Sequence, residues 1–446
     1  MNGGAESKLI LVGLVLFFAC DSGAKDSPKI EKQTPKPTTT TAKKKKAADP
    51  RLADSAKFLR SRAFRRATLE GSMVNPKNGY SSLRLSKYAL EKKDGKATGW
   101  EALPVWNPPA RPLTVDDIGK KFQDKPLKPL NLDVPWTHEA LIELGRRAFL
   151  EWPLGEDPAL GRVLSSREAV RKKGFWVGDG KRVNGLMLVK KADGTTTVAD
   201  TCSSCHTHID ASGKAVVGSA SVDYRYDQVR YEDGKRNGAS AAELKEYKDW
   251  GAGHVDPTGD GMKNPTGIAD LRSIRHQNYL NAAASVRNSA MALIVRAESL
   301  MITAHGQQVR PPRIVAVAVA YWLRSLAKPR NPAPLTAVEK QGRKLFDTHK
   351  CTECHNHDGT PGKPVALKRV GTDPATGKSP NRGTGNYRVP ALWGVGDRRR
   401  FLHRGQVRSL EQLFDRARLK TTPGHDFGLN LKDAERKALI AYLRRQ

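Results

Sequence analysis

Two short stretches carry the residues with the clearest chemistry, residues 202–206 (CSSCH) and residues 351–355 (CTECH). Each has the spacing Cys-x-x-Cys-His, which places two thiols and one imidazole on the same side of a helical turn. Thiols placed in this way can form thioethers to a porphyrin edge while the imidazole reaches the iron. The spacing therefore predicts two covalently attached haem c groups. The predicted attachment residues are Cys202, Cys205, Cys351 and Cys354, and the predicted proximal iron ligands are His206 and His355.

Two other uses of paired cysteines fit less well. A zinc ribbon would need the two pairs within about 15–20 residues of each other, and it would need no histidine after each pair. The pairs in this chain are much further apart. A thioredoxin-like redox centre would need one pair, without a histidine at that position. Covalent haem attachment remains the interpretation that uses all six residues.

The elements that must position these motifs occur twice in the chain. Residues 144–149 (LGRRAF) resemble residues 341–346 (QGRKLF), and each opens a predicted helix that leads toward a motif. His305 and His425 precede similar closing helices, at residues 321–324 and 441–444, by the same spacing. We expect a mainly α fold with two tandem cytochrome c-like haem domains, at residues 133–330 and 335–446.

The residue on the far side of each haem decides what the iron can do. A Met or His there gives a closed electron carrier, whereas an open position admits peroxide, oxygen or substrate. For the haem at His355 a methionine from its own domain is excluded, because the last methionine of the chain is Met301. His357 lies too close to His355 to reach the opposite face. His425, in a glycine-flanked loop before the last helix, is the predicted distal ligand.

The repeat then predicts His305 as the distal ligand for the haem at His206. Other residues of the first domain remain alternatives for this position: His254, Met262, His276, Met291 and Met301.

The N-terminal part predicts export. Lys8 precedes a short apolar run that ends at Cys20, which is too short to span a bilayer and is typical of a signal-peptide core. Residues 1–20 are therefore predicted to be a signal peptide with a lipoprotein cleavage box, in which Cys20 is acylated. Residues 21–50 are rich in Lys, Thr and Pro and are predicted to be a disordered tether. The predicted location is the periplasmic side of a bacterial membrane, with ordinary secretion as the alternative.

Residues 51–132 contain few apolar residues and many prolines, so we expect an irregular, extended N-terminal arm. Within it, residues 53–69 predict a basic helix and residues 81–90 a short strand.

The charge balance concerns partners rather than fold. The chain has 77 Lys and Arg against 46 Asp and Glu, a formal net charge of +31. A field of this sign favours anionic lipid, nucleic acid or an acidic protein. Export argues against nucleic acid, so the expected partners are an acidic redox protein and, through the lipid anchor, a membrane. Residues 256–261 do not have the EF-hand ligand spacing and are predicted to form a turn, while a calcium ion between the domains remains an alternative.

The two motifs and the segments that follow the second one resemble the bacterial di-haem cytochrome c peroxidases and MauG-like enzymes. The resemblance covers roughly residues 136–446. It is sharpest in residues 389–393 (VPALW), in residues 401–405 (FLHRG) and in Leu410-Glu411. It implies that one haem relays an electron while the other meets peroxide, with His403 as a pocket residue. The chain departs from the family at Arg404 and near Ala417, where the relaying haem of the family often takes a Met ligand.

The predicted function is electron transfer through two covalently bound haems. The alternative is a peroxidase that reduces hydrogen peroxide with electrons relayed between the haems, and a weaker alternative is oxygen activation. A peroxidase needs an acid–base group near the iron. The candidates for it are His403 and, because it lies near His305 in the sequence, Glu298.

Overall fold

The computed structural model describes residues 49–119, 126–191, 193–263, 265–327 and 330–446, which all belong to one compact unit. The predicted signal peptide, Cys20 and nearly all of the predicted tether lie outside the described residues. Within the described ranges no helix is both long enough and apolar enough to cross a membrane.

The N-terminal segment is helical and packed, so the prediction of an extended, irregular arm is wrong for its first half. Its elements are η1 (Pro50–Leu52), α1 (Ala53–Arg60), α2 (Arg62–Ser72), α3 (Gly79–Lys87) and η2 (Gly99–Ala102). The predicted basic helix is divided at Ser61, whose side chain accepts a hydrogen bond from the backbone N–H of Phe64. The predicted strand at residues 81–90 is instead α3, capped by Asn78. Tyr80 and Tyr88 are buried in the core, which the alternation of leucines did not indicate.

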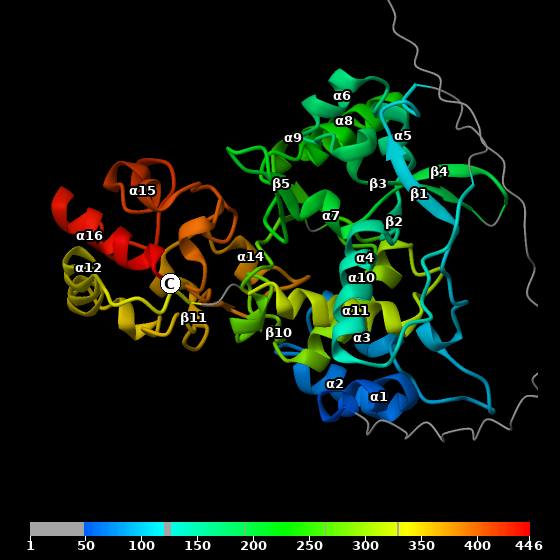
Figure 1. The fold of residues 1–446 in the computed structure, drawn as a ribbon, viewed down its shortest axis with the longest axis horizontal. Coiled ribbons are helices and arrows are strands. Elements are labelled where there is room, and N and C mark those ends of the chain that lie inside the picture. The colour runs from blue at the N-terminus through cyan, green and yellow to red at the C-terminus, as the bar shows by residue number, and fades with distance from the viewer. Residues whose placement is uncertain (1–48, 120–125, 192, 264, 328–329) are drawn as a thin grey trace, which may run out of the picture. The chain divides into compact units, whose positions relative to one another are not determined.

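Helices make up most of the part that carries the first motif (Figure 1). They are α4 (His138–Glu151), α5 (Pro158–Val163), α6 (Arg167–Lys172), η3 (Asp179–Lys181), α7 (Cys202–Cys205), α8 (Tyr226–Arg236), α9 (Ala241–Trp250), η4 (Ile274–His276), α10 (Ala290–Ala304) and α11 (Arg313–Ser325). The longest of them, α4, α10 and α11, bury apolar faces in one core cluster together with residues of the N-terminal helices.

A four-stranded antiparallel sheet is inserted between α4 and the first motif. Its strands, in spatial order, are β1 (Ala110–Thr114), β3 (Arg182–Lys190), β4 (Thr196–Asp200) and β2 (Gly155–Glu156). Leu186 and Leu188 of β3 and Val198 of β4 are buried on one face of this sheet. The sheet braces the first motif, since Asn184 of β3 donates a hydrogen bond to the carbonyl of Ser203.

Four short two-stranded ladders complete the strands. They are β5 (Thr207–Ile209) with β6 (Ala215–Val217), β7 (His254–Val255) with β8 (Thr266–Gly267), β9 (Tyr279–Leu280) with β10 (Val286–Arg287), and β11 (Val365–Ala366) with β12 (Asn386–Tyr387).

The part that carries the second motif is smaller and has its own core. Its helices are α12 (Ala337–Thr348), η5 (Cys351–Glu353), α13 (Leu367–Val370), α14 (Ala375–Lys378), η6 (Val395–Asp397), α15 (Leu410–Leu413), η7 (Arg416–Lys420) and α16 (Asp433–Arg444). The predicted capping box of α12 is present, with Thr336 and Glu339 bonded to each other's backbone N–H groups. Phe346 of α12 and Leu439 of α16 are buried in this second core.

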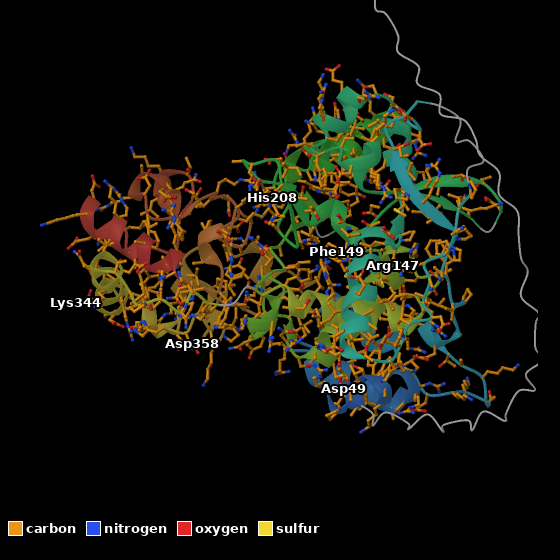
Figure 2. The ribbon with its side chains drawn as sticks, in the orientation of Figure 1. Asp49, Arg147, Phe149, His208, Lys344 and Asp358 are labelled. Carbon is orange, nitrogen blue, oxygen red and sulfur yellow. The ribbon has the colours of Figure 1, made fainter. Side chains whose placement is uncertain are left out.

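The helix that precedes each motif crosses the last helix of its part at a glycine. A Cβ atom on Gly145 of α4 would lie 2.0 Å from the carbonyl oxygen of Ala318 in α11. A Cβ atom on Gly342 of α12 would lie 2.0 Å from the carbonyl oxygen of Ala438 in α16. The repeated sequence therefore builds the same close backbone contact twice. Figure 2 labels Phe149 in α4 and Lys344 in α12, one residue from each pair.

Replacing the crossing glycines should separate the helices. We expect Gly342→Ala and Gly145→Ala each to lower the free energy of unfolding by about 1–3 kcal/mol, because the added methyl group overlaps backbone atoms that cannot move alone. Thermal unfolding followed by circular dichroism measures the effect. Gly71→Ala in α2 is the matched control, because a Cβ there meets nothing within 4 Å, and it should be neutral or stabilising. Equal melting temperatures for all three variants would contradict the crossing argument.

Candidate functional site

Both Cys-x-x-Cys-His motifs form single helical turns. The backbone N–H of His206 donates to the carbonyl of Cys202 at 3.1 Å, and the N–H of His355 donates to the carbonyl of Cys351 at 2.9 Å. Each turn therefore brings its histidine next to its first cysteine, as the spacing predicts. The four described cysteines form no disulfides.

The surroundings of the thiols argue against the two alternative uses of cysteine. Burial raises the pKa of Cys202 to about 12 and that of Cys351 to about 11. A redox nucleophile or a zinc ligand needs the opposite, a stabilised thiolate. In addition, no three His, Cys, Asp or Glu side chains of the described residues converge on a site that could hold a metal ion. This finding also leaves the predicted calcium ion without a cluster of side-chain ligands there.

One cavity of about 850 Å³ reaches both motifs. Its wall includes all the cysteines and histidines expected to hold two haems: Cys202, Cys205, His206, Cys351, Cys354, His355 and His425. Apolar residues cover much of the remaining wall, among them Phe149, Leu293, Leu300, Leu413 and Leu439. A ring system with apolar faces fits such a space.

The proximal histidine of the first motif has its ring orientation fixed by a backbone carbonyl. His206 Nδ1 lies 2.9 Å from the carbonyl oxygen of Ala269. In the neutral ring Nδ1 must then donate, and Nε2 is the atom left to bind a metal. Such an outer hydrogen bond is the usual support of an iron- or zinc-bound imidazole.

The second motif has the same arrangement in a looser form. Burial lowers the pKa of His355 to about 3, and the carbonyl of Pro390 partly opposes this shift. Pro390 precedes Leu392 by the same two residues by which Ala269 precedes Leu271. His355 Nδ1 nevertheless has no hydrogen-bond partner of good geometry within the described structure. The repeat thus supplies one carbonyl behind each histidine.

His425 lies where the sequence predicts a distal ligand. It lines the cavity together with His355, and repulsion between the two rings contributes to lowering the pKa of His355. Its Nδ1 is buried without a hydrogen-bond partner among the described residues, and its backbone has a positive φ of 53°. A ring held in this strained conformation opposite a haem motif suits the role of an iron ligand.

A buried arginine holds the His425 loop in place, and the sequence gave no sign of it beyond its charge. Arg418, 6% exposed, donates to the carbonyl oxygens of Leu413, Thr422, Gly424 and His425 at 2.7–2.9 Å. The backbone N–H of His425 also donates to the carbonyl of Val370 at 2.6 Å. The loop is thus fixed on both sides of the imidazole.

His305 is not brought to the cavity. Its ring lies 4.4 Å from the ring of Trp106 and 6.0 Å from that of Trp152, and its Nε2 lies 3.4 Å from the carbonyl of Pro153. The indole rings occupy the space through which the imidazole would have to pass. The geometry gives no support to His305 as a distal ligand, and the assignment stays a prediction from the repeat.

Of the alternatives for the first haem, only His254 and Met301 line the cavity. Met301 is 2% exposed and lies on the cavity-facing side of α10 with Ala297 and Leu300. His276 is instead stacked on Trp393, with ring centroids 3.7 Å apart. Met262 and Met291 do not contribute to the wall.

Glu298 is a structural residue rather than an acid–base group, which corrects the sequence-based candidate. It is fully buried on the side of α10 that faces the N-terminal segment, and it does not line the cavity. Its carboxylate accepts a hydrogen bond from Tyr88 at 2.6 Å and pairs with Arg313 at 3.1 Å. Arg313 also pairs with Glu101, which pairs with Arg65. Proximity in sequence misled because the helix turns Glu298 away from the cavity.

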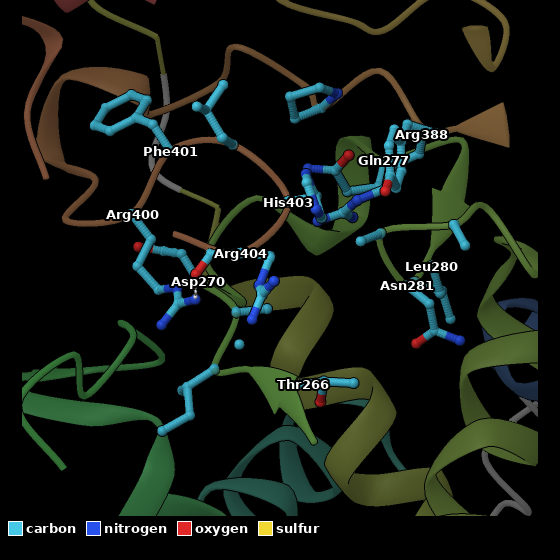
Figure 3. Close-up of a pocket in the computed structure, with 18 of the residues that line it drawn as sticks. Thr266, Asp270, Gln277, Leu280, Asn281, Arg388, Arg400, Phe401, His403 and Arg404 are labelled. Carbon is cyan, nitrogen blue, oxygen red and sulfur yellow. Dashed lines mark hydrogen bonds between the residues drawn. The ribbon is translucent and has the colours of Figure 1, made fainter. Parts of the chain in front are cut away.

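His403, the other acid–base candidate, does face the cavity (Figure 3). Both of its ring nitrogens are buried without a hydrogen-bond partner among the described residues. Burial lowers its pKa to about 4, so the ring is neutral at pH 7. It is stacked on Tyr387, with ring centroids 4.6 Å apart.

The histidines two residues after each proximal histidine differ from each other. His357 is fully used in packing, since its ring nitrogens lie 2.8 Å from the hydroxyl of Tyr442 and 2.8 Å from the carboxylate of Asp347. His208 has an unpartnered Nδ1 within the described structure. Figure 2 labels His208 and Asp358, which follow the two motifs.

Comparison with known proteins assigns the second part. Residues 339–446 match the family model described as cytochrome c, so this part is a cytochrome c domain that supports covalent haem c. No curated protein matches the chain.

Solved structures to which the chain is similar include three haem-related proteins. Kuenenia stuttgartiensis hydrazine synthase is 16% identical with a TM-score of 0.33, and the match covers 80% of this chain and 98% of that one. A MauG-like protein associated with microbial copper homeostasis is 15% identical with a TM-score of 0.28, covering 71% and 91%. The diheme peroxidase BthA from Burkholderia thailandensis is 17% identical with a TM-score of 0.26, covering 77% and 94%. At these TM-scores the cytochrome c assignment rests on the family model and the haem motif.

Removing the arginine that fixes the His425 loop should release this histidine. We expect Arg418→Gln to lower the free energy of unfolding by about 2–3 kcal/mol, because buried carbonyls lose a charged donor, and to reduce the low-spin ferric signal of the haem at His355. Thermal unfolding and low-temperature EPR measure the two effects. Arg416→Gln is the matched control, an exposed arginine in the same η7 turn, and it should leave both unchanged. An unchanged low-spin signal in Arg418→Gln would show that this loop does not present a ligand.

Proposed function

We propose, from the cytochrome c domain at residues 339–446, that the chain is a di-haem c-type cytochrome which transfers electrons through two covalently bound haems. The observation that carries this proposal is the single cavity that reaches both Cys-x-x-Cys-His turns. One continuous, largely apolar space would hold two redox groups near each other without water between them.

The attachment residues of the two haems follow from the motifs. Cys202 and Cys205 would hold the first haem, with His206 as the proximal ligand. Cys351 and Cys354 would hold the second, with His355 as the proximal ligand. When bound, each haem supplies a one-electron couple whose potential depends on its axial ligands, its burial and nearby charges.

The protein's own contribution is to hold these groups in one geometry. The carbonyl of Ala269 orients His206, and the buried apolar wall excludes water. Arg418 keeps His425 opposite His355, so the second site would be closed by two imidazoles. A site that changes little between oxidation states suits fast electron transfer.

For the first haem we propose Met301 as the distal ligand in place of His305. Met301 lines the cavity on α10, whereas His305 is held between two indole rings outside it. A thioether is a common axial ligand of c-type haem and raises its potential.

A di-haem peroxidase is the second candidate, and the observation in its favour is His403. Reduction of hydrogen peroxide to two water molecules consumes two electrons and two protons, and it needs a group that moves a proton at the peroxide oxygens. A neutral imidazole with both nitrogens unpartnered, facing the cavity, meets this requirement. Electron transfer stays the first proposal, because His425 would have to leave its fixed loop to open the second site.

The proposed setting is the outer side of a bacterial inner membrane, with Cys20 as the lipid-bearing residue and an acidic redox protein as partner. The basis for this is the apolar run before Cys20 and the net charge of +31.

Low-temperature EPR on the fully oxidised and half-reduced protein, with and without peroxide, tests the function. For an electron carrier we expect two low-spin ferric signals that remain low-spin on half-reduction and do not respond to peroxide. A high-spin signal that peroxide abolishes would overturn this expectation in favour of the peroxidase.

Variants of the distal residues test the ligands. His425→Ala should convert the second haem to high spin, and Met301→Leu should do so for the first, because each change leaves the iron without its sixth ligand. His305→Ala should preserve both low-spin signals, as should the control His349→Ala, which alters a histidine outside the cavity. Loss of the first low-spin signal in His305→Ala would restore the assignment from the repeat.

A further inference from the structure

Three arginines from three distant parts of the chain surround the ring of Tyr80. The guanidinium carbon of Arg84 lies 3.5 Å from the ring centroid, and those of Arg296 and Arg382 each lie 5.6 Å away. Tyr80 and Arg84 are 1% exposed and Arg382 is 8% exposed. This Tyr80 cluster joins the N-terminal segment, helix α10 and the second haem part.

Each of the three guanidinium groups has a buried N–H without a partner among the described residues. These atoms are Arg84 Nη2, Arg296 Nη1 and Arg382 Nε. A buried charged donor that lacks an acceptor costs several kcal/mol, and natural proteins rarely leave several such donors together. The cluster therefore lacks an acceptor that the folded chain does not itself supply.

The cluster belongs to the wall of the haem cavity. Arg296 and Arg382 both line it, next to Asn381. Arg296 is near the first proximal histidine, since its charge contributes to lowering the pKa of His206, a shift caused mainly by burial. The unpartnered donors thus lie beside the space expected to hold the first haem.

The carboxylates in the neighbourhood do not use up these donors. Burial and Arg296 lower the pKa of Arg382, while Tyr80, Asp256 and Asp260 oppose the shift through their charge. Asp260 has one carboxylate oxygen buried without a hydrogen-bond partner in the described structure. Two carboxylates beside three guanidinium groups leave room for a further anion.

We propose that Arg84, Arg296 and Arg382 form a carboxylate site that binds the propionates of the haem attached at Cys202 and Cys205. This inference rests on the proposed function, because it needs that haem to be present. Guanidinium groups match the planar geometry of a carboxylate, and buried carboxylates require such partners. The N-terminal segment thereby becomes part of the haem site, since it supplies Arg84 and Tyr80.

A small free carboxylate has the same chemistry as a propionate, so the experiment must separate the two sources. Midpoint potentials are measured by spectroelectrochemistry on the full-length haem-loaded protein, with and without acetate. The variants are Arg296→Gln and Arg382→Gln. Arg382→Lys keeps the charge, and Arg408→Gln removes an exposed arginine that does not line the cavity.

Removing a positive charge next to the ring favours the ferric state. We expect each Gln variant to shift the ferric–ferrous equilibrium of one haem at least tenfold toward ferric, a fall of about 59 mV for a one-electron couple. Arg382→Lys should shift it less, and Arg408→Gln should not shift it. The propionate bending bands in the resonance Raman spectrum should move in the same variants, a change that loosened packing alone would not confine to these bands.

Three results would overturn the proposal. Unchanged potentials and Raman bands in both Gln variants would mean that the arginines do not contact the haem. A wild-type potential that depends on acetate, with the dependence lost in the variants, would assign the site to a free anion. A wild-type protein without covalent haem by mass spectrometry would remove the proposed function and this inference together, whereas haem content that is normal in every variant confines any failure to the arginine site.

Discussion

The close crossing of two helix pairs is the constraint on which the rest of the structure depends. Gly145 against Ala318 and Gly342 against Ala438 bring backbones nearer than any side chain would allow. Each crossing fixes the helix that leads toward a motif relative to the last helix of that part. The cavity wall follows from this, because Phe149 and Val319 line it from the first pair and Phe346 and Leu439 from the second. Without the crossings, the Cys-x-x-Cys-His turns would lack a common frame.

The sequence predicts those features that rest on local spacing or on repetition. The helical turns of the two motifs are confirmed, and so is the cytochrome c domain, for residues 339–446. His425 lies on the cavity wall as expected from its loop. The inserted sheet was not predicted, because β3 pairs with β1 across a long stretch of chain and no local pattern records such a partner. His305 shows the limit of the repeat, since Trp106 from the N-terminal segment packs against it and has no counterpart in the second copy.

The N-terminal segment was misread for a related reason. Its low apolar content predicts an irregular arm, but its arginines are buried in ion pairs rather than exposed. Arg65 and Arg313 share Glu101, and Arg313 also reaches Glu298, with side-chain exposures between 1% and 14%. Buried pairs of this kind add little net stability, yet breaking one is costly. Composition counts these charges as solvent-exposed, whereas the fold uses them to attach the segment to α10.

The two halves of the cavity differ in a way that bears on the direction of electron flow. In the second half the wall presents His425, and an imidazole is the stronger donor, which favours ferric iron and a lower potential. In the first half the wall presents Met301 and the charge of Arg296, and both would favour ferrous iron. With haems bound as proposed, electrons would therefore move from the second site to the first. Arg382 belongs to the second part of the chain but contributes to the Tyr80 cluster beside the first site, so the part that would donate the electron also helps to set the potential of the acceptor.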